Sequence, residues 1–122
     1  MTDRTDDDIV DAWIALQYAE RGSVSYDQNF WAHMSLDEVI DGNRERCWKI
    51  IGEIKSRDGS DFILSNLAAG PVEDLLSRYG EDVIERVEND AKRDGRLKFL
   101  LGLVWKNNIP DDVWERIQRI VK

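Results

Sequence analysis

The chain has 122 residues, of which 34% are charged, and 25 acidic against 17 basic side chains give a formal net charge of −8. A chain of this length buries enough apolar surface to fold as one domain without a metal, and its single cysteine excludes an internal disulfide. The acidic N-terminal run and the short apolar stretches are unlike a signal peptide or a membrane span, so we expect a cytoplasmic protein.

The charge is unevenly distributed along the chain. Residues 1–42 hold ten acids and two bases and account for the whole net charge, whereas residues 43–122 are neutral and residues 96–122 carry +3. An acidic domain repels phosphate, so we expect no direct contact with nucleic acid, and we expect no membrane contact either. The acids can attract a basic protein, imitate a nucleic acid, or simply keep the protein in solution.

The first predicted helix covers residues 6–19. Thr5 and Asp8 have the spacing of a capping box, and the acids that follow Thr5 suit the positive end of a helix dipole. Apolar residues at helical spacing, Ile9, Trp13 and Leu16, predict the buried face. Gly22 lies just past the predicted end, where helices often terminate.

Residues 22–34 show no regular apolar period. We predict an ordered loop or a short helical turn here, with a short extended piece at residues 23–26 as an alternative. Phe30, Trp31 and Met34 are large and apolar, and we expect them to fold onto the core.

Two helices are predicted in the middle of the chain. Ser35 and Glu38 have capping-box spacing, which predicts a short helix that starts after Ser35 and ends near Asp41. Residues 43–57 form the next helix, whose apolar stripe consists of Cys47, Ile50, Ile51 and Ile54.

The rest of the chain is predicted as five short helices, at residues 61–69, 71–79, 81–92, 96–106 and 111–121. Gly70-Pro71, Gly80 and Gly95 are interpreted as the stops between them. Connections of two to four residues favour antiparallel neighbours. We therefore predict an all-α fold of compact antiparallel helical hairpins, either an irregular bundle or a short α-solenoid-like stack. It forms one domain over residues 1–122, with an acidic segment at 1–42 and a helical-hairpin core at 43–122.

A set of motifs spans much of the second half of the chain. It comprises Leu-Ala-Ala-Gly-Pro at residues 67–71, Glu-Asp-Leu-Leu at 73–76, Gly80, Ile-Glu-Arg-Val-Glu at 84–88, Ala91, Leu100, Gly-Leu-Val-Trp at 102–105 and Val-Trp at 113–114. With Trp-Lys-Ile-Ile at 48–51, these motifs resemble an uncharacterised bacterial family of unknown function. Asp94-Gly95 stands where such sequences tend to have Asp-Pro. The resemblance implies a helical fold in a bacterial or phage protein, and it implies no activity or catalytic residue.

Few residues suit catalysis or ligand binding. His33 is the one histidine, Cys47 lies on an apolar stripe, and Glu81, Glu85 and Glu88 share a helix face that is predicted to be solvated. With one His and one Cys, a zinc site would depend on carboxylates, and the sequence has no phosphate-binding glycine motif. We therefore expect no catalytic residue, no metal and no cofactor.

Trp31 is the tryptophan best placed to contact a partner, because it lies in the least regular segment and acids flank it. Trp105 and Trp114, in contrast, belong to apolar patterns and are predicted to lie in the core. The predicted partner-binding surface combines Trp31 with seven of the ten acids of the first 42 residues: Asp6, Asp7, Asp8, Asp11, Asp27, Asp37 and Glu38.

The sequence thus favours a small acidic protein-binding module, immunity-like or inhibitory toward another protein with a basic surface. A phage counter-defence protein or a nucleic-acid mimic is an alternative. A second alternative is an enzyme with an unrecognised carboxylate site, which would need two acids with raised pKa values in a deep pocket.

Overall fold

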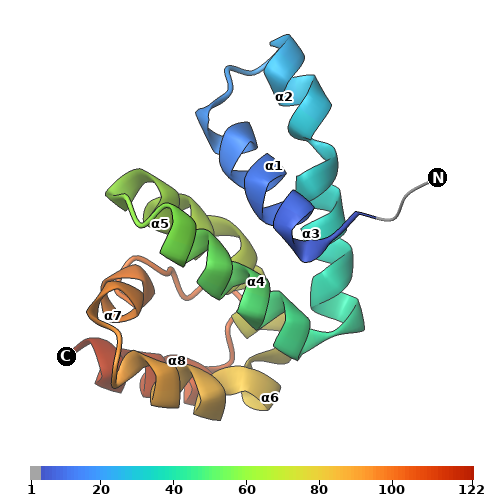
Figure 1. Ribbon diagram of the computed structural model, residues 1–122. Coiled ribbons are helices and arrows are strands. Elements are labelled where there is room, and N and C mark those ends of the chain that lie inside the picture. Colours follow the sequence, from blue (N-terminus) through green and yellow to red (C-terminus); the bar gives the residue numbers. More distant parts are fainter. Residues whose placement is uncertain (1–3) are drawn as a thin grey trace. The chain divides into compact units, whose positions relative to one another are not determined.

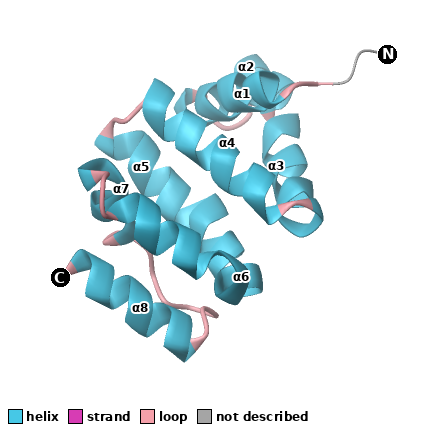
Figure 2. Ribbon diagram, turned by 60° about the horizontal axis from the view of Figure 1, so that its bottom comes forward, coloured by secondary structure: helices cyan, strands magenta, loops and turns pink. Residues whose placement is uncertain are grey.

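The computed structural model describes residues 4–122, so Asp3 of the acidic N-terminal run lies outside the described residues. Residues 4–122 form helices joined by turns and by one longer loop at residues 102–110, and no strand occurs among them (Figures 1 and 2). The predicted all-α fold of packed helices is therefore confirmed. The chain divides into two compact units, one ending at Ile63 and one beginning at Leu64. The assignment of one domain to the whole chain stays a prediction.

Unit 1 is built on four helices: α1 (Asp6–Tyr18), α2 (Val24–Asn29), α3 (Trp31–Gly42) and α4 (Arg44–Arg57). α1 packs against each of the other three, and α3 packs against α4. The predicted apolar stripe of α4 is fully buried, as is Trp13 of α1, so both predictions of core residues are confirmed. Burial of these faces is the main favourable term in the stability of a helical unit.

The predicted start of α1 is confirmed in detail. The Thr5 hydroxyl accepts a hydrogen bond from the Asp8 backbone N–H at 3.1 Å, and the Asp8 carboxylate accepts one from the Thr5 N–H at 2.9 Å. Beyond the helix, Gly22 has a φ of +82°, a conformation that glycine adopts without steric cost. Ser23 follows this turn. Its hydroxyl accepts a hydrogen bond from the Tyr26 backbone N–H at 3.1 Å and so caps α2.

Residues 22–34 are mostly helical, so the helical alternative of the prediction is the right one, although it extends well beyond one short turn, and the loop and the extended piece are wrong. Phe30 joins α2 to α3 with helical dihedrals (φ −59°, ψ −28°), so the chain scarcely leaves helical geometry between them. Ser35 therefore lies inside α3, and the predicted capping box at Ser35 does not form. Burial explains the earlier start, because Ala32 and Leu36 share the inward face of α3.

Unit 2 begins within α5 (Asp61–Leu67) and continues through a π-helical turn (Ala68–Val72) into α6 (Glu73–Ala91). α7 (Gly95–Leu101) and α8 (Asp111–Val121) follow, and both pack against α6 and against each other. The predicted stop at Gly70-Pro71 is wrong, because the chain stays helical there. Pro71 lacks an N–H and crowds the carbonyl four residues back in a regular α-helix, and the wider π turn accommodates both effects.

The predicted boundary near Gly80 coincides with a kink in α6. Two helical segments meet at Tyr79, whose dihedrals (φ −138°, ψ 27°) are not helical. Gly80 is buried, and a Cβ atom at this position would lie 2.9 Å from Cγ1 of Val113 on α8. Its missing side chain therefore allows α8 to approach α6 closely.

α7 is shorter than the predicted helix at residues 96–106. It begins at Gly95, which was predicted as a stop, because the Asp94 carboxylate accepts hydrogen bonds from the Arg96 and Leu97 N–H groups at 3.0 Å each. It ends at Leu101, after which the helical spacing no longer determines which side chains face the core. Trp105 is 74% exposed, so its predicted place in the core is wrong, and Trp114 is half-buried.

Candidate functional site

Three of the predicted partner-binding residues line one hollow in unit 1. Asp8 and Asp11 of α1 and Trp31 of α3 surround a cavity of about 400 Å³, together with Arg4. Ala12 and Ala15 also line it, and their small side chains leave the space open. The helical period explains the grouping, because residues 8, 11, 12 and 15 share one face of α1.

Arg4 covers the indole of Trp31. Its guanidinium carbon lies 3.6 Å from the ring centroid, which is a cation–π contact. Trp31 is half-buried, so a partner reaches only part of its surface. One face of the indole is thus already occupied by a cation of the chain itself.

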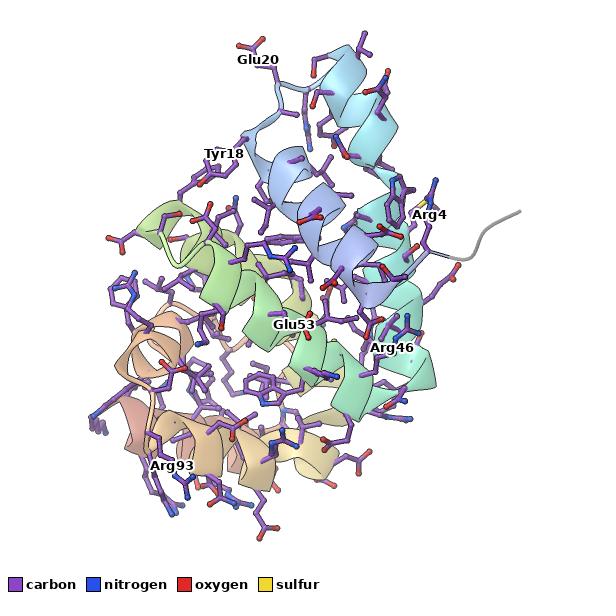
Figure 3. All side chains as sticks on the ribbon, viewed as in Figure 1. Arg4, Tyr18, Glu20, Arg46, Glu53 and Arg93 are labelled. Atoms are coloured by element: carbon purple, nitrogen blue, oxygen red, sulfur yellow. The ribbon has the colours of Figure 1, made fainter. Side chains whose placement is uncertain are left out.

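Arginines of α4 hold several of the predicted acids. Asp6 pairs with Arg46 at 2.8 Å, and Arg57 pairs with Asp7 at 3.3 Å and with Asp11 (Figure 3 labels Arg46). The hydrogen bond from Arg57 to Asp11 raises the pKa of Arg57 above its ordinary value. These exposed pairs offset much of the negative charge of α1, so the first-helix acids present a weaker field than their number implies.

The remaining predicted residues lie on the outer face of α2 and α3. A period of 3.6 residues places Asp27, Asp37 and Glu38 on the same side of this nearly continuous helix as Phe30 and Met34. Phe30 and Met34 are 38% and 57% exposed, so the prediction that they fold onto the core is wrong. We call these five residues the α2–α3 face.

Aromatic contacts order the α2–α3 face. The ring of Phe30 lies 5.7 Å from that of Tyr26 and 5.5 Å from that of His33, measured between centroids. Sequence reasoning missed this cluster because it expected at most a short helical turn there, although Phe30 and Met34 have i, i+4 spacing that indicates a shared face.

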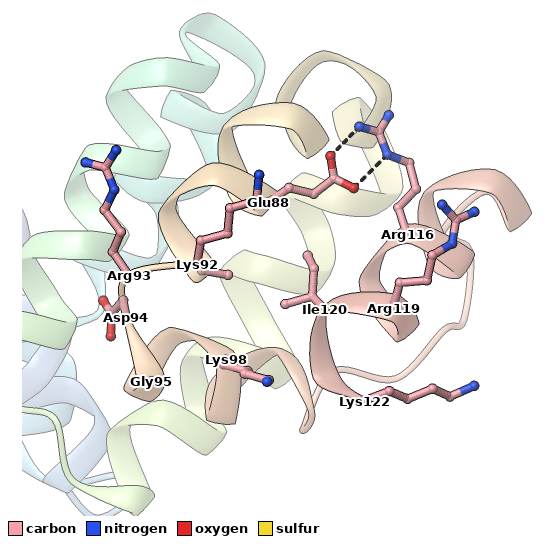
Figure 4. A pocket seen from close by; sticks show the side chains of 11 residues that line it. Glu88, Lys92, Arg93, Asp94, Gly95, Lys98, Arg116, Arg119, Ile120 and Lys122 are labelled. Carbon is pink, nitrogen blue, oxygen red and sulfur yellow. Dashed lines mark hydrogen bonds and ion pairs between the residues drawn. The ribbon is translucent and has the colours of Figure 1, made fainter.

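A second hollow, in unit 2, has the opposite charge. It has a volume of about 720 Å³ and lies among the end of α6, the start of α7 and the end of α8 (Figure 4). We call it the basic cleft. Its cationic residues are Lys92, Arg93, Lys98, Arg116, Arg119 and Lys122, and its acidic ones are Glu88 and Asp94. The charge of +3 over residues 96–122 is the sequence signal for it, but Lys92 and Arg93 lie outside that range, in the turn between α6 and α7.

Both acids of the basic cleft have local partners. Glu88 accepts two hydrogen bonds from Arg116, one of them from Nε at 2.9 Å (dashed lines in Figure 4). This pairing lowers the pKa of Glu88 below its ordinary value and raises the pKa of Arg116. Asp94 caps α7. The pairing joins α6 to α8 and fixes the position of the Arg116 guanidinium.

The other candidate residues, Glu88 excepted, lie apart from both hollows. Cys47 is fully buried in unit 1, as predicted, and His33 is exposed. Glu81 and Glu85 are exposed, as predicted, whereas Glu88 is half-buried and paired. Within residues 4–122 no group of three or more His, Cys, Asp or Glu side chains is close enough to hold a metal ion. No helix in that same range combines the length and the apolar character needed to cross a membrane.

A family model matches residues 19–122, which include α2 to α8 and therefore the α2–α3 face and the basic cleft. The chain belongs to DUF6869, a family of unknown function. The resemblance to such a family is thus confirmed. No curated protein and no solved structure matches the chain.

Proposed function

We propose that this protein is a binding module that attaches to a basic surface of another protein through the α2–α3 face of unit 1. The observation that carries the proposal is the exposure of Phe30 and Met34 side by side on a helix rimmed by acids. Exposed apolar side chains within a charged rim are typical of a protein interface, where the apolar centre gives affinity.

The rim gives the expected chemistry of the partner. Asp27 and Glu38 are exposed, and Asp37 is half-buried beside Met34 on the same face. A net charge of −8 speeds the approach of a cationic protein, and acids at the rim act mainly on the association rate. We favour an inhibitory or immunity-like role, because an acidic rim speeds association with a basic target protein.

The pKa values of three carboxyl groups are those of ionised binding groups. Asp58, Glu88 and Asp111 each have a lowered pKa value. A carboxyl group that donates a proton near neutral pH needs a raised value instead.

The test compares two matched variants in capture from native lysate. Phe30→Ala/Met34→Ala removes the apolar centre of the α2–α3 face, and Trp105→Ala removes an exposed aromatic side chain from unit 2. We expect wild type and Trp105→Ala to retain the same basic protein in stoichiometric amounts and the double variant to lose it. Retention by the double variant would contradict the proposed face.

The purified partner then allows the rim to be tested. Asp27→Asn/Asp37→Asn/Glu38→Gln should slow association and flatten its salt dependence, while dissociation changes little. The control neutralises Glu81 and Glu85 in unit 2, which changes net charge without touching the face. An equal slowing in both variants would assign the effect to net charge alone.

A further inference from the structure

The basic cleft of unit 2 holds more positive charge than its structural roles require. Six cations face two acids there, an excess of four positive charges, and both acids are already engaged by Arg116 and by the start of α7. Among the described residues, no hydrogen bond or ion pair at contact distance engages the side chains of Lys92, Lys98 or Arg119. These three cations lie in the turn between α6 and α7, in α7 and in α8.

Helix ends account for only part of this excess. α6 and α8 end at the cleft, and each helix C-terminus carries about half a negative charge, which favours nearby Lys and Arg. Two such ends offset roughly one of the four excess charges. About three positive charges then exceed what the two lining acids and the helix ends offset, and Glu88, already paired with Arg116, is the acid that acts on Lys92 and Arg119. Bringing like charges together has an electrostatic cost, which a bound anion would relieve.

We propose that the basic cleft is a binding site for a small molecule that bears two or more phosphate groups. The cleft volume of about 720 Å³ lies in the range of small-ligand pockets. Lys92, Lys98 and Arg119 supply the charge, and Arg116, held by Glu88, presents a guanidinium in a fixed position (Figure 4). Ile120 adds an apolar surface on which an organic group can rest.

A compact anion fits better than a nucleic-acid strand. A strand needs a positive surface that continues along its backbone, and the chain as a whole carries −8. The positive residues of the cleft instead converge on one hollow among the end of α6, α7 and the end of α8. The site is also independent of the α2–α3 face, since none of its residues belongs to that face.

The experiment titrates the full-length protein with inorganic triphosphate at low salt and follows backbone amide signals by NMR. We expect one-to-one binding, with shifts concentrated in residues 88–98 and 116–122. Lys98→Gln/Arg119→Gln should weaken binding at least tenfold. The matched control Arg21→Gln/Lys49→Gln removes two exposed cations elsewhere and should change affinity less than twofold.

Three outcomes would overturn the proposal: no saturable binding, equal weakening in both variants, or tighter binding of a single-stranded oligonucleotide than of triphosphate. Arg116 is left intact so that its pair with Glu88 still joins α6 to α8. Thermal unfolding without ligand checks that each variant is folded, and Lys98→Gln alone, expected to weaken binding at least threefold, replaces the double variant if that one is not. Capture of the protein partner should be unaffected in either case, which separates this site from the proposed function.

Discussion

Gly80 shows how a single residue sets the distance between two helices. A methyl group there would meet Cγ1 and Cγ2 of Val113 at 2.9 and 3.2 Å, distances that require α8 to move. We expect Gly80→Ala to destabilise the protein by about 1–3 kcal/mol, as overpacking of a core does. Urea unfolding followed by circular dichroism measures the change.

The control for this prediction is Gly52, which lies inside α4 with nothing near its absent side chain. Gly52→Ala should stabilise the protein by up to about 1 kcal/mol through helix propensity alone. Combining Gly80→Ala with Val113→Ala should recover part of the loss, because it removes the colliding methyl groups. No recovery would show that the kink at Tyr79, rather than Val113, requires glycine.

Tyr18 and Asp58 give a prediction about protonation. The Tyr18 hydroxyl donates to the Asp58 carboxylate at 2.7 Å, and this bond, with a smaller contribution from Ser60, lowers the pKa of Asp58 below 3.8. Tyr18→Phe keeps the ring contact with Phe62 but removes the donor, so the pKa of Asp58 should rise toward 3.8. NMR titration of the carboxyl carbon measures it. Ser60→Ala should cause a smaller rise, and the reverse order would refute this assignment.

At the scale of elements, the pair of Glu88 and Arg116 links α6 to α8. The folded-state pKa of Glu88 lies below its ordinary value of 4.5, so the stabilisation is present above pH 4.5 and is lost as the pH falls through the folded-state value. Both side chains are partly exposed, so the effect is small. We expect Glu88→Gln to lower the melting temperature by a few degrees at most at pH 7, and not at all in strong acid. Thermal scans from pH 7 to pH 3 test this, and a loss independent of pH would exclude the ion pair as its cause.

Elements with one clear face were predicted well from sequence. Thr5 and Asp8 define the start of α1 locally, and the stripe from Cys47 to Ile54 defines the inward side of α4. Predictions failed where a local signal competes with packing. Ser35 has a capping pattern but lies inside α3, because burial of Ala32 favours a helix that starts before Ser35. Pro71 would end a regular α-helix, but the π-helical turn accommodates it.

The candidate sites also differ in how far they could be predicted from sequence, because some depend on local helix spacing and others on tertiary packing. Asp8, Asp11 and Trp31 were predicted together and do line one hollow, because two of them share a face of α1. The ion pairs of Arg46 and Arg57 join residues about 40 to 50 positions apart, and no sequence period reports such contacts. The basic cleft likewise assembles from three helices, and only tertiary packing brings them together.

For the whole molecule, Cys47 offers a simple reporter of opening in unit 1. Its side chain has no exposed surface and it is the one cysteine of the chain. A thiol reagent can therefore react with Cys47 only after unfolding exposes it. The free energy of unfolding in domains of this kind is about 5 kcal/mol or more. We expect labelling at least about a thousandfold slower than in urea-unfolded protein. Labelling at a comparable rate in the two states would mean that α4 opens locally.

The helical joint between the units has a consequence for fragmentation. The division falls between Ile63 and Leu64, inside α5, where a protease finds no extended chain to cut. The nearest exposed, non-helical position is Gly59-Ser60, just before α5. Limited proteolysis should therefore release a C-terminal fragment that keeps α5 whole and begins a few residues before the packing boundary. The expected protease cleavage site at Gly59-Ser60 therefore differs from the boundary between the units at Ile63 and Leu64.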